Sequence, residues 1–394
     1  MTNVRQPFLR SVLAVAAALA LTGCAGPRPA SETPSYFLSV QDGRAGLADG
    51  KAVVRNASDS LAVVELSSGR LRVMQQVAMP TSLVGPPSSV AIAPGGRLAL
   101  VSAATRRDPA DAAKVVPFDL VSVLELDPAA NTAPRVIASL QTGAGASGIS
   151  ISRAGTLALV ANRVEGSVSV LAIEGNQVRA VGKVALGDKS GPAHVAFTPD
   201  GRRALVTRDG DNRISLLVID GHSVKLDPRE LYAGLRPYGL DVSPDGAWAA
   251  VTNLGAGLGD ADTISLIDLR AASPRVVDTV TVGQTPEGIF FSPDGRMVGV
   301  TVIDGSNKPQ ASAFHGTARY RMFSVDGGRL APAADLAGGQ WLQGHAFTSD
   351  GGALLVQDAA DRQIRLYRRT GNSLADTGER LQLDAAPSAV KFWH

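Results

Sequence analysis

The chain has 394 residues, of which 45% are hydrophobic and 19% are charged, so it is long enough to bury a large core. Its formal net charge of +2 falls to 0 when Arg5 and Arg10 are removed with the segment interpreted below as a signal peptide, and a neutral domain argues against nucleic acid as a partner. Because Cys24 is the only cysteine, the chain forms no internal disulfide and no thiolate metal site.

Residues 1–23 have the features of a bacterial signal peptide. Arg5 and Arg10 form a charged start, and Val12 to Leu21 form an apolar run that is too short to span a bilayer. The small residues that lead to Cys24 resemble the lipobox of bacterial lipoproteins, in which the cysteine is acylated after cleavage. We therefore predict lipidation at Cys24, with an ordinary signal peptide and an incidental cysteine as the alternative.

Residues 24–48 are predicted to be the lipidated cysteine and a flexible tether, because proline and small polar residues dominate from Ala25 to Ser35. Several acyl chains make a stable membrane anchor. Ala25 stands where an aspartate often directs retention in the inner membrane. The sequence thus resembles a lipoprotein of the cell envelope, anchored in the outer membrane and facing the periplasm, and we expect the folded domain to span residues 49–394.

A repeated unit occupies this domain. Each unit starts at a proline or small residue, has an apolar residue three positions later, and reaches a turn glycine nine positions after its start. The starts and their glycines are Pro87 with Gly96, Ala146 with Gly155, Pro192 with Gly201, Pro237 with Gly246, Pro286 with Gly295, and Leu342 with Gly351, and a seventh start, Pro387, lies near the chain end. The spacing is that of a four-stranded propeller blade.

The unit that starts at Pro192 illustrates the expected strands. Val195 and Phe197 alternate as in a strand, Pro199-Asp200-Gly201 has the composition of a tight turn, and Ala204 to Thr207 predicts a second strand. Ile214 to Ile219 predicts a third strand, and Val224 to Leu226 a weaker fourth. Few segments have helical periodicity, so we expect an all-β fold.

The two ends of the domain are expected to share one blade. The unit at Pro387 has only a first strand, whereas the N-terminal segment supplies strands over Lys51 to Val54, Leu61 to Leu66 and Leu71 to Val77. A seven-bladed propeller closed by this composite blade leaves no free sheet edge. The alternatives are an open stack, or eight blades with Tyr36 to Val40 as an extra strand.

The repeat resembles known propeller families. Its turns, and the strand pair exemplified by residues 159–162 and 166–170, look like YVTN-type repeats and like lactonase-like propellers typified by 6-phosphogluconolactonase. The segment from Gly191 to Phe197 is similar to a lactonase segment whose histidine lies at the rim of the central cleft, which implies such a place for His194. The preceding unit has Ala146-Ser147-Gly148, without the histidine-rich motif that the family usually carries there.

One face of the propeller is the expected place for a site, because three insertions lengthen its loops: Ala103 to Phe118, Asn253 to Asp262 and Asp304 to Met322. His194, Glu287 and Arg236 are candidate catalytic residues, since a histidine or carboxyl group serves as a general base and an arginine binds a carboxylate. The candidate ligand-binding residues are Tyr238, Gln343, Arg319, Arg321 and His315, and Trp341 belongs to the same loops. The alternative is that these polar side chains are merely solvated, and His345, at an apolar position of its unit, is expected to be a core residue.

Two functions remain open. The first is a membrane-anchored binding or scaffold module that uses the loop face to bind a periplasmic protein or a small anionic ligand. The second is a lactonase-like hydrolase of a small anionic lactone or ester. Asp260 and Asp262 are too few ligands for a calcium site, and no motif for zinc, a nucleotide or a nucleophilic serine occurs, so we expect neither a metal nor a cofactor.

Overall fold

A computed structural model of the chain describes residues 1–2, 33–83, 85–127 and 132–394. The predicted signal peptide, Cys24 and most of the predicted tether lie outside these residues. Residues 34–394 form one compact unit, and every regular element within its described part is a β-strand. No helix in the described ranges is long and apolar enough to cross a membrane.

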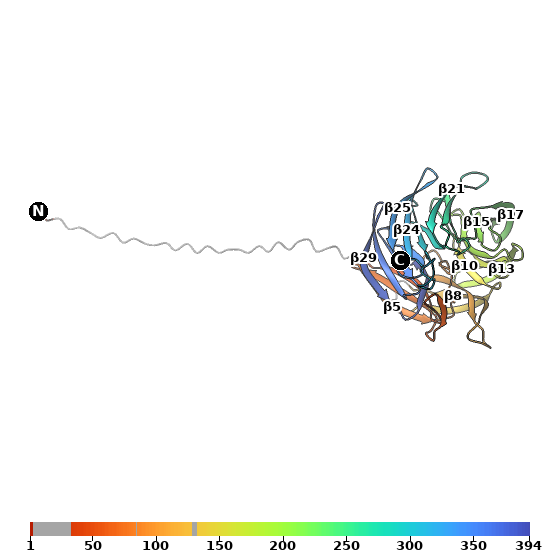
Figure 1. Cartoon of the computed structure of the whole chain (residues 1–394), viewed down its shortest axis with the longest axis horizontal. Helices are drawn as coiled ribbons and strands as arrows, with labels where there is room; N and C mark the ends of the chain where they lie inside the picture. The colour runs from red at the N-terminus through yellow and green to blue at the C-terminus, as the bar shows by residue number, and fades with distance from the viewer. Residues whose placement is uncertain (3–32, 84, 128–131) are drawn as a thin grey trace. The chain divides into compact units, whose positions relative to one another are not determined.

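The strands form seven four-stranded sheets, which are the blades of a propeller (Figure 1). Blade 1 contains β6 (Val90–Ile92), β7 (Leu98–Arg107), β8 (Val115–Glu125) and β9 (Arg135–Gln141); blade 2 contains β10 (Ala146–Ile151), β11 (Leu157–Asn162), β12 (Ser167–Glu174) and β13 (Gln177–Ala185). Blade 3 contains β14 (Pro192–Phe197), β15 (Arg203–Arg208), β16 (Arg213–Asp220) and β17 (Ser223–Leu231); blade 4 contains β18 (Pro237–Val242), β19 (Trp248–Asn253), β20 (Asp262–Asp268) and β21 (Arg275–Gly283). Blade 5 contains β22 (Pro286–Phe291), β23 (Met297–Val302), β24 (Arg319–Asp326) and β25 (Arg329–Ala337); blade 6 contains β26 (Leu342–Phe347), β27 (Ala353–Asp358), β28 (Gln363–Thr370) and β29 (Ser373–Gln382).

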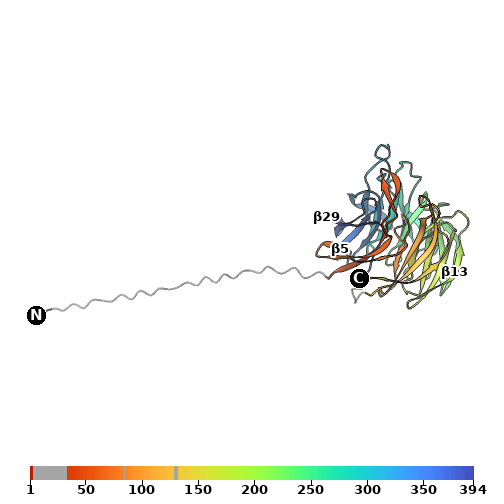
Figure 2. The same cartoon turned by 90° about the horizontal axis from the view of Figure 1, so that it is seen from below.

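Blade 7 is the predicted composite blade, and its strand order is β30-β1-β4-β5. β30 (Ala386–Phe392) is the inner strand from the C-terminal end, and β1 (Ser35–Asp42), β4 (Ser60–Ser67) and β5 (Arg70–Ala78) come from the N-terminal part. The inner strands of successive blades contact one another around the ring, including β30 with β6. The prediction of seven blades closed by both parts of the chain is confirmed. β5 of this blade contacts β29 of blade 6, and the two strands lie side by side in Figure 2.

The predicted start of the propeller at residue 49 is wrong, and so is the part of the predicted tether from residue 35 to residue 48, which contains β1 and β2. Ser35–Asp42 forms the second strand of blade 7, where Phe37 pairs with Phe392 on one side and with Val64 on the other. Its residues from Phe37 to Asp42 are buried whichever way they point, so the strand lacks the polar alternation of a half-buried strand, and only the eight-bladed alternative includes Tyr36 to Val40 as a strand. Lys51–Val54, predicted as a blade strand, is instead β3 of a separate hairpin with β2 (Ala45–Ala48).

Local sequence explains the turns and the core. In blade 3 the Thr198 hydroxyl donates to the Asp200 carboxylate over 2.6 Å, and Gly201 has a φ of 69°, which a glycine adopts without strain. The alternating apolar residues of neighbouring blades pack together, as Leu159 of blade 2 does with Val195 of blade 3 in one buried cluster. Each such side chain contributes about 1.5 to 3 kcal/mol through burial.

Candidate functional site

Three threonines at the ends of second strands hold the start of the next blade in place. The Thr207 hydroxyl donates to the carbonyl of Tyr238 over 2.5 Å, Thr252 to that of Glu287 over 3.0 Å, and Thr301 to that of Gln343 over 2.6 Å. Each hydroxyl also accepts from a backbone N–H of the inner strand in its own blade, at 3.1, 2.7 and 2.9 Å. The backbones that carry three of the predicted site residues are thus tied to the preceding blade.

His194, at the start of β14, is buried and neutral. Its Nδ1 lies 2.9 Å from the hydroxyl of Ser88 in blade 1, and its ring centroid lies 4.8 Å from that of Tyr238 in blade 4. Burial, and then the nearby Arg163 guanidinium, lower the pKa of His194 to about 3. Its Nε2 is buried and has no hydrogen-bond partner among the described residues.

Two arginines share one carboxylate beside Tyr238. Arg163 binds Asp209 with Nε 3.3 Å from Oδ1, and its Cζ lies 5.7 Å from the Tyr238 ring centroid. The Arg236 NH2 group lies 3.3 Å from the second oxygen, Oδ2, of Asp209. The Asp209 side chain is only 4% exposed, whereas those of Arg163 and Arg236 are 41% and 40% exposed. The cluster therefore presents two guanidinium groups to solvent over a buried carboxylate.

Glu287, at the start of β22, lies on the same face of the propeller as His194 and Tyr238. Burial raises the pKa of Glu287 to about 7, against smaller opposing effects of Trp341, Arg163 and Gln343. Its Oε2, the Trp341 Nε1 and the Gln343 Oε1 are buried without a hydrogen-bond partner in the described part of the chain. Glu287 and Arg163 both act electrostatically on the hydroxyl of Tyr238, whose pKa is raised mainly by burial. Adjacent blades thus bring several unsatisfied polar atoms together.

The β2–β3 hairpin and the predicted insertions cover part of this loop face. The Asp49 carboxylate in the hairpin turn accepts the N–H of Gln310 over 2.8 Å, and Arg107 donates to the carbonyl of Arg44 over 2.9 Å. The 253–262 and 304–322 insertions are joined by Lys308, whose Nζ lies 2.8 Å from the carbonyl of Gly257. A hollow of about 20 Å³ lies between the hairpin and the starts of blades 6 and 7.

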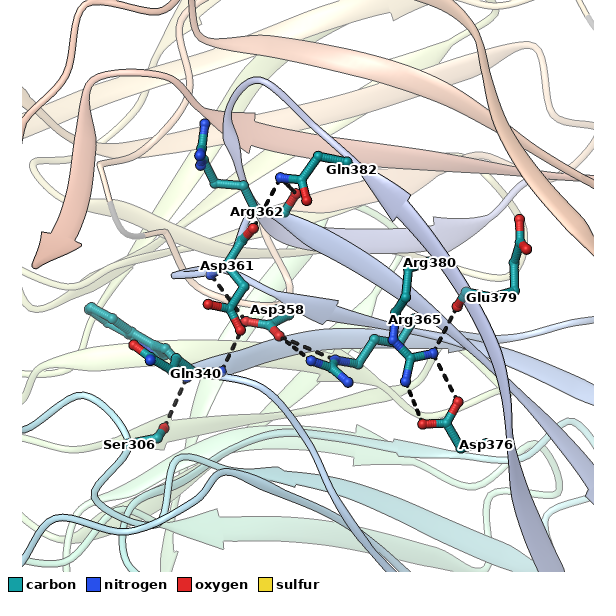
Figure 3. A network of polar contacts seen from close by, with 11 residues as sticks. Ser306, Gln340, Asp358, Asp361, Arg362, Arg365, Asp376, Glu379, Arg380 and Gln382 are labelled. Carbon is teal, nitrogen blue, oxygen red and sulfur yellow. Dashed lines mark hydrogen bonds and ion pairs between the residues drawn. The ribbon is translucent and has the colours of Figure 1, made fainter.

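A polar network in blade 6 holds the segment that carries Trp341 (Figure 3). The Ser306 hydroxyl accepts the backbone N–H of Trp341 over 2.9 Å. Asp358 accepts from the backbone N–H of Gln340 over 3.2 Å and from the Arg365 NH2 group over 3.0 Å. Burial, followed by the nearby Asp361, raises the pKa of Asp358 to about 7. Blades 5 and 6 therefore fix the loop that covers Gln343.

The structure brings together only some of the predicted site residues. Tyr238 lies at the centre of the predicted residues that come together: its ring contacts that of His194, and Arg236 and Glu287 act electrostatically on its hydroxyl. Gln343 lies next to Glu287. Arg319 and Arg321 instead pair with Asp335 of the outer strand, at 2.6 and 3.2 Å. The exposed His315 lies in the blade 5 loop, with its Nδ1 3.0 Å from the carbonyl of Lys308.

Sequence reasoning missed Arg163 and Asp209. Each follows directly after the second strand of its blade, in the short loop before the third strand. The length of a loop of this class singles out only the three insertions. The feature that identifies Arg163 and Asp209 is their position directly after the end of a second strand. Among the described residues no group of three or more histidines, cysteines or acids is placed to hold a metal ion.

Comparisons with known proteins agree with this architecture. A family model described as lactonase, 7-bladed β-propeller, matches residues 118–238. A putative 6-phosphogluconolactonase from Bacteroides fragilis has 17% identity and a TM-score of 0.72, covering 92% of this chain and 98% of its own. The periplasmic gluconolactonase of Pseudomonas aeruginosa has 18% identity and a TM-score of 0.71, covering 92% and 99%.

The chain is a seven-bladed β-propeller, and its match to the lactonase family model covers residues 118–238. Hydrazine synthase from Kuenenia stuttgartiensis has 19% identity to it and a TM-score of 0.56, covering 74% of this chain and 79% of its own. No curated protein matches this chain. At such low identities the likeness concerns the fold, and activity has to be argued from the site.

Proposed function

We propose that the lactonase-like propeller binds a small anionic molecule at the loop face. The observation that carries this proposal is the pair of half-exposed guanidinium groups of Arg163 and Arg236, held by the buried Asp209. Two arginines and one aspartate leave a local excess of positive charge. Guanidinium groups bind carboxylates and phosphates through two parallel hydrogen bonds, and their attachment to Asp209 reduces the entropy lost on binding.

The ligand class that we propose is an oxygen-rich acid or its lactone. The N–H groups of the half-exposed Arg163 and Arg236 side chains would donate to the carboxylate and hydroxyl oxygens of such a ligand. Two proteins of similar fold are named as gluconolactonases, one of them putative, which agrees with this class.

Hydrolysis of a lactone or ester is the second candidate function. It is favoured by the pKa of Glu287, which at about 7 lets this carboxyl group exchange a proton near neutral pH. His194 lies in the same cluster, but its pKa of about 3 makes it a weak base near neutral pH. The catalytic step requires water beside one of these groups, and both Nε2 and Oε2 are shielded from solvent. Binding is therefore the function that the geometry supports better.

Calorimetric titration of the full chain carrying Cys24→Ser tests the proposal with gluconate, 6-phosphogluconate and gluconolactone. We expect Arg163→Gln to weaken binding about tenfold or more, which corresponds to about 1.4 kcal/mol. Arg179→Gln is the matched control, because Arg179 forms an exposed ion pair with Glu174 on the outer part of blade 2. Absence of binding by all three compounds would contradict the proposal.

Turnover distinguishes the two candidate functions. If the chain binds gluconolactone without consuming it, the propeller is a binding module. If it hydrolyses the lactone ring of gluconolactone, loss of turnover with retained binding in Glu287→Gln would assign that step to Glu287. Turnover that is unchanged in both Glu287→Gln and His194→Ala would exclude these two groups as the base.

We also propose that the chain is anchored in the cell envelope through acylated Cys24 and faces the periplasm. The charged start, the apolar run and the small residues before Cys24 support this. Growth with an alkyne analogue of palmitate should label the full chain and leave Cys24→Ser unlabelled. Equal labelling of both, or of neither, would contradict lipidation at this residue.

A further inference from the structure

The face opposite the loop face has a hollow that the proposed function does not use. Its volume is about 330 Å³, which is within the range of small-molecule sites. It lies at the carboxyl ends of three adjacent inner strands, β10, β14 and β18, whereas the arginine cluster lies at the other end of the ring. Its polar lining includes Ser150, Arg153, Asp241 and Ser243.

Asp241 is the acidic group of this hollow. It is half-buried, and its Oδ2 accepts the backbone N–H of Phe291 from blade 5 over 2.8 Å. Burial raises the pKa of Asp241, while the ammonium group of Lys391 has the opposite effect. One oxygen is therefore held by the fold, which orients the carboxylate for a cation that enters the hollow.

Lys391 supplies a positive charge from the other side of the ring. Its Nζ lies 5.6 Å from the ring centroid of Phe290, a cation–π distance. Asp241, Phe290 and Lys391 each stand four residues after the start of their unit, so all three lie at one level of the inner strands. Arg153 adds a second, exposed positive charge in the turn after β10.

None of these charges is neutralised by a direct ion pair between described residues. The ion pairs of the described part of the chain involve neither Asp241 nor Lys391 nor Arg153. A structural salt bridge would bring the two charges into contact, whereas here Asp241 and Arg153 line an open hollow and Lys391 lies outside its lining. That pattern is complementary to a ligand with charges of both signs.

We propose that this hollow binds an acidic α-amino acid. The ammonium group of the ligand pairs with Asp241, one carboxylate pairs with Lys391, and the other pairs with Arg153. The two carboxylates and one ammonium of such a ligand match Asp241 and Arg153, which line the hollow, together with Lys391, which acts electrostatically on Asp241 from beside it. Phe197 and Val242 of the lining supply an apolar surface for the methylene groups between the charges. This site is independent of the loop-face cluster.

Calorimetric titration of the full chain with L-glutamate tests the proposal, with glutarate as the probe that lacks the ammonium group. We expect L-glutamate to bind more tightly than glutarate. Asp241→Asn should weaken glutamate binding about tenfold or more and remove the preference over glutarate. Asn still offers an oxygen to the N–H of Phe291, and the exposed Lys391→Gln provides a second variant that leaves the core intact.

Two controls separate this site from the loop face. Arg163→Gln should leave glutamate binding unchanged, and Asp241→Asn should leave any gluconate binding unchanged. Arg229→Gln, which alters a pair with Asp227 on the outer strand of blade 3, controls for loss of surface charge. No binding of glutamate, or equal binding to the unaltered chain, Asp241→Asn and Lys391→Gln, would overturn the proposal.

Discussion

The Nδ1 atom of His194 lies 2.9 Å from the hydroxyl of Ser88, although these residues belong to the third and first blades. The contact passes Gly148 of the blade between them. A Cβ atom at Gly148 would lie 2.7 Å from the Ser88 hydroxyl and 2.8 Å from the Cα of His194. The missing side chain at one position thus allows a histidine to span two blade interfaces.

Gly148→Ala should destabilise the fold by about 1 to 3 kcal/mol, because the added methyl group forces the inner strands apart. Urea unfolding measures this change. Gly182→Ala is the control, since a Cβ at Gly182 would have its nearest contact at 3.8 Å. A Gly148→Ala chain as stable as the unaltered one would show that the interface accommodates the methyl group.

Thr252→Val should lower the free energy of unfolding by about 1 to 3 kcal/mol, because the buried carbonyl of Glu287 and the N–H of Gly239 both lose their partner. The valine has nearly the shape of the threonine, so packing is preserved. Thr281→Val, at an exposed position of β21, should change the free energy of unfolding little. Similar unfolding midpoints for the two variants would argue against a stabilising role of the inter-blade bond.

His345 should make the fold sensitive to acid. It lies among the rings of Phe290, Tyr320 and Phe347, and burial lowers its pKa from 6.5 to about 3. Because the unfolded chain takes up the proton first, the stability is complete above pH 6.5 and is lost as the pH falls toward 3.

His345→Phe should therefore reduce the loss of stability between roughly pH 6.5 and 4.5 by about 2 to 3 kcal/mol. His194 titrates in the same direction and remains in the variant, so part of the acid sensitivity should persist. The measurement is the free energy of unfolding of the unaltered chain and of His345→Phe at the two pH values. An unchanged difference between them would exclude His345 as a source of the acid sensitivity.

Glu287 should act in the opposite direction. Its pKa in the fold is about 7 instead of 4.5, so stability is complete below pH 4.5 and falls as the pH rises toward 7. The loss is on the order of 3 kcal/mol. Glu287→Gln should flatten the stability between about pH 5 and 8, whereas Glu174→Gln, at an exposed ion pair, should not. If the free energy of unfolding depended on pH equally in both variants, the raised pKa of Glu287 would be contradicted.

The position of β1 predicts which shortened chains fold. A chain that begins at residue 34 retains β1, whereas one that begins at residue 49 lacks the strand between β30 and β4. We expect cooperative thermal unfolding from the first and loss of it from the second, because β4 and β30 would each lack the backbone pairing that β1 supplies. Cooperative unfolding of both chains would mean that the blade closes without β1.

The sequence alone determined the seven-bladed ring and its closure by both parts of the chain. The reason is that a turn such as Pro199-Asp200-Gly201, and the alternation of Val195 and Phe197, are set by torsion angles and side-chain directions within a few residues. Repetition then places the strands, since each blade buries its apolar faces against its neighbours.

Only the tertiary structure decided the membership of blade 7 and of the site. The residues from Tyr36 to Val40 allow a strand, but its place between β30 and β4 depends on pairing with residues from both parts of the chain. Arg163 contacts Asp209 only after two successive blades have packed side by side, and His194 contacts Ser88 only across the blade between them. Arg319 and Arg321, expected at the site, are paired within their own blade by Asp335. Such contacts depend on the distance and angle between blades, which no short segment of the sequence encodes.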